Sequence, residues 1–107
     1  MYRINVYIPV SHLEAVKTAM FAAGAGRIGV YDQCCWQVEG LGQFRPLEGN
    51  QAFIGETHKL ERVSEYKVEM VCKDTVIKAV IKAMLAAHPY EEAAYDISLA
   101  IDPSSIG

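Results

Sequence analysis

The sequence predicts an α+β fold in which a four-stranded antiparallel sheet carries two helices on one face, with the elements in the order β-α-β-β-α-β. Three observations lead to this prediction. Apolar residues alternate in four segments, as they do in half-buried strands. They recur at helical spacing in two further segments. A shift of 64 residues superposes Tyr2 on Tyr66 and Val16 on Val80, strand on strand and helix on helix. Two β-α-β halves of this kind form the ferredoxin-like arrangement.

The first strand and the first helix are predicted between residues 2 and 24. Ser11 and Glu14 match a capping box, in which the serine side chain accepts a hydrogen bond from an unpaired helix N–H. We therefore expect the helix to begin at Ser11, and Gly24 is placed to end it. Alternation in the strand puts one set of side chains on a buried face: Tyr2, Ile4, Val6 and Ile8.

The second strand is predicted from residue 34 to residue 38. Alternation is interpreted as placing Cys34, Trp36 and Val38 on the buried face, with Cys35 and Gln37 on the other. This parity is opposite to that of the last strand under the 64-residue shift, and a β-bulge between residues 31 and 34 would reconcile the two. The stretch from 40 to 55 holds four of the eight glycines, which predicts a brief strand extension and then a long surface loop.

The second half of the chain repeats the order. Residues 66 to 73 alternate as a third strand, with a hairpin partner near residues 59 to 63. Asp74 or Thr75 can cap the second helix, which should end before Pro89 because proline disfavours helical backbone at the preceding residue. Residues 95 to 99 alternate as the last strand, and a polar tail follows. The apolar stripe of the second helix consists of Val76, Ile77, Val80, Ile81, Met84 and Leu85.

Composition favours one soluble domain over residues 1 to 107. Apolar residues make up 51% of the chain, charged residues 21%, and the formal net charge is -3, so disorder is excluded as the main state. The chain lacks the basic surface that binds phosphate backbones and any apolar stretch long enough to cross a bilayer, so we expect neither nucleic acid nor a membrane as partner. Three cysteines, two of them adjacent, fit reduced thiols, and the cytoplasm is the expected compartment.

The run from residue 88 to residue 92 is the strongest chemical candidate. His88, Glu91 and Glu92 place an imidazole and two carboxylates where a helix gives way to a strand, and such groups can hold a divalent metal or transfer protons. We favour the structural alternative, in which His88 suits the helix end electrostatically, Pro89 breaks the helix and the glutamates form a solvated turn. We expect no cofactor, with a divalent metal at these residues as the alternative.

Three further segments carry weaker signals. The glycines between residues 24 and 29 follow a helix rather than precede one, which predicts a helix end and a tight turn instead of a phosphate-binding loop. Cys34 and Cys35 are not a C-x-x-C pair, and we expect Cys34 in the core and Cys35 at the surface. Phe44 and Leu47 have no place in a two-layer core, so their loop is expected to cover a ligand or a neighbouring subunit.

Four runs of residues together resemble the YqfO-type domain, which is found inserted in the Nif-three-like proteins, also known as GTP cyclohydrolase I type 2 homologues. The runs are G-A-G-R-I-G-V-Y-D-Q-C (24 to 34), V-E-G-L-G-Q-F-R-P-L-E-G-N (38 to 50), F-I-G (53 to 55) and H-P-Y-E-E-A-A-Y-D-I (88 to 97). They span nearly the whole chain in order, so the chain looks like that insert standing alone. It departs from the family pattern at Gln51 and Ala52, where relatives commonly have a proline.

The resemblance implies a fold similar to the CutA and PII trimeric signalling proteins, and hence a homo-oligomer with a trimer favoured. Hydrolase or cyclohydrolase activity does not carry over, because the flanking halves that hold the family's dinuclear metal site have no counterpart in this sequence. The motif positions that carry over are expected at a ligand site or an interface: Gly26, Gly29, Tyr31, Cys34, Gly40, Gly42, Phe44, Pro46, Leu47, Gly49, Pro89, Tyr90, Tyr95 and Asp96.

We therefore expect a non-enzymatic oligomeric module with no catalytic residues. It would bind a small ligand or a protein partner at clefts between subunits, lined by the loop from 40 to 55 and the turn from 88 to 92. One alternative is a small metal-dependent hydrolase or metal-binding protein that uses His88, Glu91 and Glu92. Another alternative is an accessory domain for a separately encoded dinuclear-metal protein that resembles the missing halves.

Overall fold

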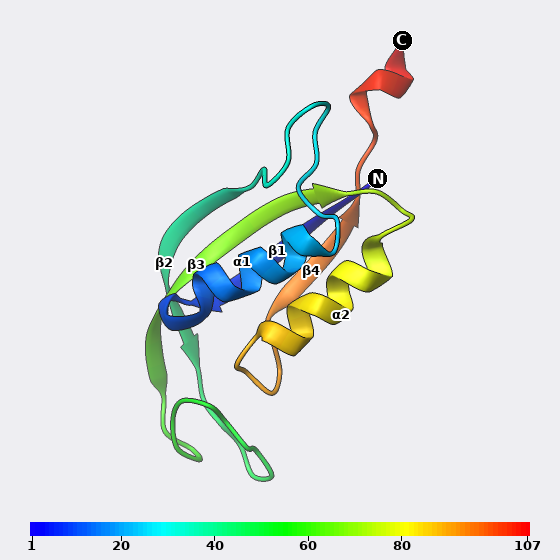
Figure 1. Ribbon diagram of the computed structural model, residues 1–107. Coiled ribbons are helices and arrows are strands. Elements are labelled where there is room, and N and C mark those ends of the chain that lie inside the picture. Colours follow the sequence, from blue (N-terminus) through cyan, green and yellow to red (C-terminus); the bar gives the residue numbers. More distant parts are fainter.

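A computed structural model describes residues 1 to 107 and shows one antiparallel sheet with both helices against the same face (Figure 1). The strand order across the sheet is β2-β3-β1-β4, so the predicted α+β class and ferredoxin-like topology are confirmed. The elements are β1 (Tyr2–Pro9), η1 (Val10–His12), α1 (Leu13–Ala22), β2 (Trp36–Phe44), β3 (Glu61–Cys72), α2 (Ile77–Ala87), β4 (Tyr95–Leu99) and η2 (Pro103–Ile106).

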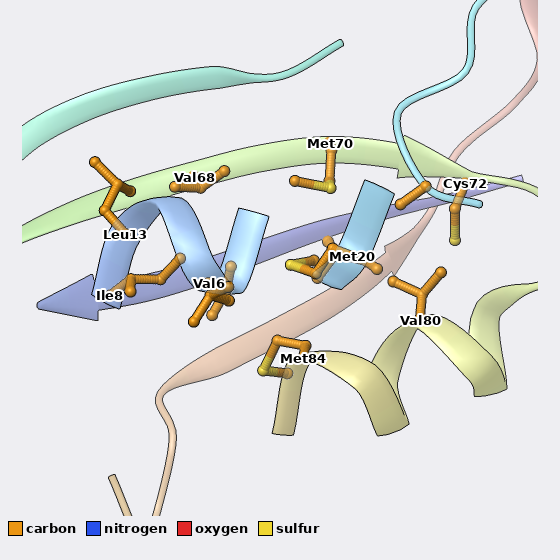
Figure 2. Close-up of a cluster of buried hydrophobic side chains, with 12 residues drawn as sticks. Val6, Ile8, Leu13, Met20, Val68, Met70, Cys72, Val80 and Met84 are labelled. Carbon is orange, nitrogen blue, oxygen red and sulfur yellow. The ribbon is translucent and has the colours of Figure 1, made fainter. Parts of the chain in front are cut away.

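The hydrophobic core lies between the sheet and the two helices (Figure 2). Three side chains of β1, Ile4, Val6 and Ile8, are fully buried, which confirms the face predicted for the first strand. Residues 65 to 72 of β3 pair with β1 along the whole length of β1, and β3 adds alternate residues to the same face. The remaining core residues are Leu13, Val16, Met20, Ala25, Val68, Met70, Cys72, Val80 and Met84.

The first helix begins later than predicted. Residues 10 to 12 form a 3-10 turn, His12 occupies the N-cap position of α1, and no side chain caps the helix. The Ser11 hydroxyl instead bonds the His12 Nδ1 at 2.8 Å, and Glu14 pairs with a lysine one turn further on. The predicted capping box is therefore wrong. The predicted end of the helix is confirmed, because Gly24 follows it with a φ of +112°.

The buried face predicted for the second strand is also wrong. Trp36 and Val38 are 68% and 50% exposed, whereas Gln37 lies opposite the fully buried Val68 of β3. Because strand side chains alternate, Gln37 faces the helices and Trp36 faces away from them. With this parity the two halves of the chain agree under the 64-residue shift, so no bulge is required to reconcile them.

The β2–β3 hairpin is longer than predicted. β2 continues to Phe44, which pairs with Glu61 at the start of β3, and the connecting loop covers residues 45 to 60. The expected hairpin partner near residues 59 to 63 is thus the first part of β3 itself. The hairpin extends past the ends of the helices, and its loop lies on the same side as the turn before β4 (Figure 1).

The second helix has no side-chain cap. Val76 is the N-cap residue, so the caps expected at Asp74 or Thr75 are wrong. The Asp74 carboxylate instead pairs with the N-terminal amine at 2.7 Å. The predicted end before Pro89 is confirmed, since His88 is already extended with a ψ of 135°.

The apolar stripe of α2 is narrower than predicted. Val80 and Met84 are fully buried, and Val76 and Ile77 pack against the core while partly exposed. Leu85 is 44% exposed, so its predicted place in the core is wrong. The molecule is elongated, with extents of 52 × 23 × 22 Å, because the β2–β3 hairpin extends at one end and the C-terminal segment after β4 extends at the other (Figure 1). No helix is long and apolar enough to span a bilayer.

Candidate functional site

A cavity of about 550 Å³ lies between the loop that follows β2 and the turn that precedes β4. These are the two segments that the sequence analysis expected to line one cleft, although 35 residues or more separate most of their members. The structure brings them together within one chain. The lining residues are Gln43, Phe44, Arg45, Pro46, Leu47, Glu48, Gly49, Asn50, Ala52, Phe53, Ile54, Glu65, Tyr90, Glu91, Glu92 and Ala94.

Aromatic rings join the two sides of the cavity. The ring of Tyr90 lies 6.0 Å from that of Phe44 and 6.3 Å from that of Phe53, measured between ring centroids, and both pairs are tilted. On the far side of Phe53, the His12 ring makes an edge contact at 5.5 Å. Such separations are within the range for favourable aromatic pairs. Phe44 therefore lies over Tyr90, but Phe53 and Leu47 stay more than half exposed.

Hydrogen bonds fix the loop on this side of the molecule. The Gln51 N–H donates to Glu91 Oε1 at 2.8 Å, which links the loop directly to the turn. Within the loop, the Asn50 amide donates to the Leu47 carbonyl at 2.6 Å and to Thr57 Oγ1 at 2.8 Å. Asn50 thus replaces backbone pairing that an irregular segment of this length lacks. The loop departs from its family pattern at Gln51, and the N–H of that residue makes the link.

His88 lies next to Tyr90 and fixes its position. Its side chain is 6% exposed, and both ring nitrogens face backbone groups: Nδ1 accepts from the Tyr90 N–H at 3.2 Å, and Nε2 lies 2.7 Å from the Tyr7 carbonyl oxygen. An acceptor at Nδ1 requires the proton on Nε2, so the ring is neutral and donates to Tyr7. Burial lowers the pKa of His88. The ring centroids of His88 and Tyr90 are 5.1 Å apart.

Glu65 contributes a carboxylate to the cavity from β3. It is half-buried, and none of the ion pairs of the chain includes it. The buried Tyr90 hydroxyl lies beside this carboxylate, and burial, the negative charge of Glu65 and a hydrogen bond to Glu65 together raise the pKa of Tyr90. A side chain at Gly42 would overlap the Glu65 carboxylate, so the glycine makes room for it.

The sequence analysis did not identify Glu65. Its position in an alternating strand is typical of an ordinary surface residue, and the signal that could have found it is Gly42, a glycine inside the neighbouring strand. Seven of the predicted positions line the cavity together with it: Phe44, Pro46, Leu47, Gly49, Tyr90, Glu91 and Glu92. Gly40 and Pro89 belong to the same two segments of the chain but do not line it.

Other predicted positions lie elsewhere in the fold. Gly26 follows α1, where its N–H donates to the Val71 carbonyl at 2.8 Å and its φ of +77° suits glycine. Gly29 and Tyr31 belong to a tight turn closed by a bridge between Ile28 and Tyr31, as expected for a turn after the helix. Tyr95 and Asp96 are exposed on β4. None of these lines the cavity.

The two adjacent cysteines are both partly buried, and the prediction that Cys34 is the one in the core is wrong. Cys35 packs against the core, whereas the Cys34 thiol donates to the Asp32 carbonyl at 3.6 Å. The reason is the strand parity described above, which places odd-numbered residues of this segment toward the helices. All three thiols are free.

The candidate metal ligands are not brought together. The chain contains no group of three or more His, Cys, Asp or Glu side chains arranged to hold a metal ion. Both ring nitrogens of His88 are engaged with backbone groups, and Glu91 accepts from the Gln51 N–H. Direct coordination of a metal ion by His88 would require these contacts to break.

The fold is a ferredoxin-like α+β fold that solved structures of CutA and GlnK share. The periplasmic divalent cation tolerance protein CutA from Archaeoglobus fulgidus superposes with a TM-score of 0.66 at 16% identity, over 94% of this chain and 84% of that one. GlnK of Bacillus subtilis superposes with a TM-score of 0.54 at 11% identity, over 91% and 82% of the two chains. At these identities the likeness concerns the fold.

Sequence similarity identifies the more particular relatives. The chain is 50% identical over 95 residues to the GTP cyclohydrolase 1 type 2 homolog of Bacillus subtilis, a match that covers 89% of this chain and 26% of that protein. A Bacillus cereus protein related to NIF3 superposes with a TM-score of 0.77 at 44% identity, over 90% of this chain and 24% of that one. The resemblance to the Nif-three-like proteins is confirmed, and the chain spans about a quarter of the length of these relatives. No family model matches the chain.

Proposed function

We propose that the chain is a non-enzymatic binding module that associates with copies of itself and takes a small ligand in the cavity between the hairpin loop and the turn before β4. The observation that carries the proposal is the cavity, because two separate motif segments meet to form it. Its size lies within the range of small-molecule sites, roughly 300 to 1,000 Å³. Aromatic rings and a few polar groups line it, which is the usual composition of such sites.

The uncovered face of the sheet supports self-association. Both helices pack on one face, and the other face has no second layer (Figure 1). Trp36 on β2 is exposed there, beside the half-exposed Val38. Only 16 of 107 residues are buried, so much of the apolar surface of the chain is still accessible. Association through this face would remove Trp36 from water, and aromatic residues of this kind are enriched at interfaces.

Charges on the same face are already paired. Arg3 on β1 lies 3.7 Å from Glu69 on β3, and Lys67 lies 3.1 Å from the same carboxylate, measured between nitrogen and oxygen atoms. Glu69 pairs directly with Trp36 across the strands. A small network of paired charges around an exposed tryptophan is compatible with a protein partner, including a second copy of the chain. We propose a trimer, the cyclic assembly that the resemblance to CutA and PII implies.

A second candidate function is that of an accessory domain. The chain matches about a quarter of the Bacillus subtilis relative, so it would act together with the remaining three quarters of such a protein, on the same chain or on another.

The three cysteines carry free thiols, which supports a reducing compartment. We propose the cytoplasm.

The metal-dependent hydrolase is less well supported than the binding module. Its candidate base and ligand, His88, is buried with both nitrogens engaged, and its partner Glu91 anchors the loop. Catalysis would require a proton-transfer group within reach of a substrate, and neither His88 nitrogen is open to the cavity in this arrangement.

Sedimentation velocity tests the assembly. We expect the unmodified protein to sediment as an oligomer and Trp36→Asp to sediment as a monomer, because a carboxylate cannot be buried at an apolar interface without a partner. Lys82→Asp is the control, since Lys82 is exposed on α2, on the helical side of the molecule. A monomeric unmodified protein, or an oligomer that tolerates Trp36→Asp with an unchanged far-UV spectrum, would overturn the assembly.

A further inference from the structure

We infer that the cavity selects a small organic cation with an apolar body, such as a primary amine on an aromatic or aliphatic group. This inference rests on the proposed function, because it assumes that the cavity is a ligand site. The structural basis is that a half-buried carboxylate without a cationic partner, Glu65, and the aromatic rings of Phe44, Phe53 and Tyr90 line the same cavity.

The charge balance of the lining favours a cation. Four carboxylates line the cavity, from Glu48, Glu65, Glu91 and Glu92, against one guanidinium, from Arg45. Glu48 Oε1 lies 3.0 Å from His58 Nε2, and Glu91 Oε1 accepts a hydrogen bond from the Gln51 N–H at 2.8 Å. Glu65 takes part in no ion pair.

A positively charged ligand group would compensate the negative charge of Glu65. A half-buried carboxylate loses part of its hydration, and a nearby positive charge would replace that part. Gly42 leaves room for the Glu65 carboxylate against β2. The neighbouring polar group is the Tyr90 hydroxyl, a neutral donor that leaves the negative charge of Glu65 uncompensated.

The aromatic wall favours an organic cation over a metal ion. Phe44, Phe53 and Tyr90 present ring faces and edges, which attract ammonium groups and pack against apolar bodies. A divalent metal would need several oxygen or nitrogen ligands converging on one point, and no group of three is present. An anion would meet three more negative than positive lining charges, four carboxylates against one guanidinium.

Calorimetric titration with benzylamine and with benzyl alcohol tests the inference. The two probes share the aromatic body and differ in the charged group, so the ratio of their dissociation constants isolates the cation. At low salt, where charge interactions are least screened, we expect benzylamine to bind at least about tenfold more tightly than benzyl alcohol. In Glu65→Gln, we expect this preference to fall below about threefold, because the charge that distinguishes the probes has been removed.

Two further variants complete the design. Glu39→Gln removes one negative charge from β2, where Glu39 bonds Ser64 and Tyr66 outside the cavity, and it should keep the tenfold preference. Gly42→Ala places a methyl group where the Glu65 carboxylate lies, so it should weaken the preference while leaving the net charge unchanged. The Gly42→Ala result decides the matter if Glu65→Gln fails to fold.

The possible outcomes separate the two proposals. Equal binding of both probes, or a tenfold preference that survives in Glu65→Gln and Gly42→Ala, would overturn the cation inference and leave the cavity as a site for neutral ligands. Binding of neither probe would overturn the inference, while sedimentation would still report separately on self-association.

Discussion

The neutral imidazole of His88 holds the turn before β4 through two backbone contacts. Its Nδ1 accepts from the Tyr90 N–H, and its Nε2 donates to the Tyr7 carbonyl of β1. One side chain therefore joins the end of α2, the central strand and the aromatic wall of the cavity. Adding a proton at Nδ1 would replace an acceptor with a donor that faces the Tyr90 N–H. The stability of the turn should thus depend on pH.

The lowered pKa of His88 fixes the direction of this dependence. Burial lowers the pKa in the folded protein, whereas the unfolded chain titrates near the ordinary value of about 6.5. The unfolded state binds more protons between the two values, so the contribution of His88 is complete above about pH 6.5 and is lost as the pH falls toward the folded-state value. We expect urea unfolding to show a smaller loss of stability between about pH 7.5 and about pH 5.5 in His88→Gln than in the unmodified protein.

His58→Gln is the control for this prediction. His58 is 58% exposed in its side chain and lies on the loop, paired with Glu48. Its removal should leave the slope with pH close to that of the unmodified protein. A His88→Gln protein whose stability falls with pH as steeply as the unmodified protein would show that His88 does not carry the effect.

Two neighbouring residues of α2 differ in burial and should therefore differ in their contribution to the free energy of unfolding. Met84 and Leu85 are neighbours on α2, yet Met84 is fully buried between the helices and the sheet and Leu85 is 44% exposed (Figure 2). Met84→Ala should cost about 2 to 5 kcal/mol of unfolding free energy, because it removes contacts and leaves a cavity. Leu85→Ala should cost about 1 kcal/mol or less. Urea unfolding of both variants measures the difference, and equal losses would contradict the packing described for α2.

Periodicity predicted where the elements lie better than it predicted their ends and faces. The buried face of β1 follows from alternation alone, because its other face is polar. In β2, Trp36 and Val38 are apolar and yet point away from the core. Alternation therefore showed that these two residues share one face of the sheet, but it did not show whether that face is the one covered by the helices. Ser11 fits a capping pattern locally, but a 3-10 turn moves the helix start beyond its reach.

The composition of the candidate site was predicted only in part. Sequence motifs identified both segments of the cavity, since glycine, proline and aromatic residues stand out in them. Glu65 was missed because its role depends on tertiary contacts: the space left by Gly42 and the approach of Tyr90 from a turn 25 residues further on. A strand residue that alternates normally carries no local sign of such neighbours.

The shape of the whole molecule departs from that of a closed domain. Its radius of gyration is 15.1 Å, compared with roughly 13 Å for a compact chain of this length, and its longest extent is 52 Å. The extended hairpin at one end and the C-terminal segment after β4 at the other account for the difference (Figure 1). Packing against further copies of the chain would cover the open face of the sheet and support the hairpin.

Native mass spectrometry of the unmodified protein tests the central claim most directly, because one spectrum reports the number of subunits and any bound mass. The proposed function predicts three copies of the 11.8-kDa chain without a stoichiometric metal ion. A clean monomer would contradict the self-associating module. Stoichiometric metal that is lost in His88→Ala would contradict the non-enzymatic binding function and return His88, Glu91 and Glu92 to the position of metal ligands.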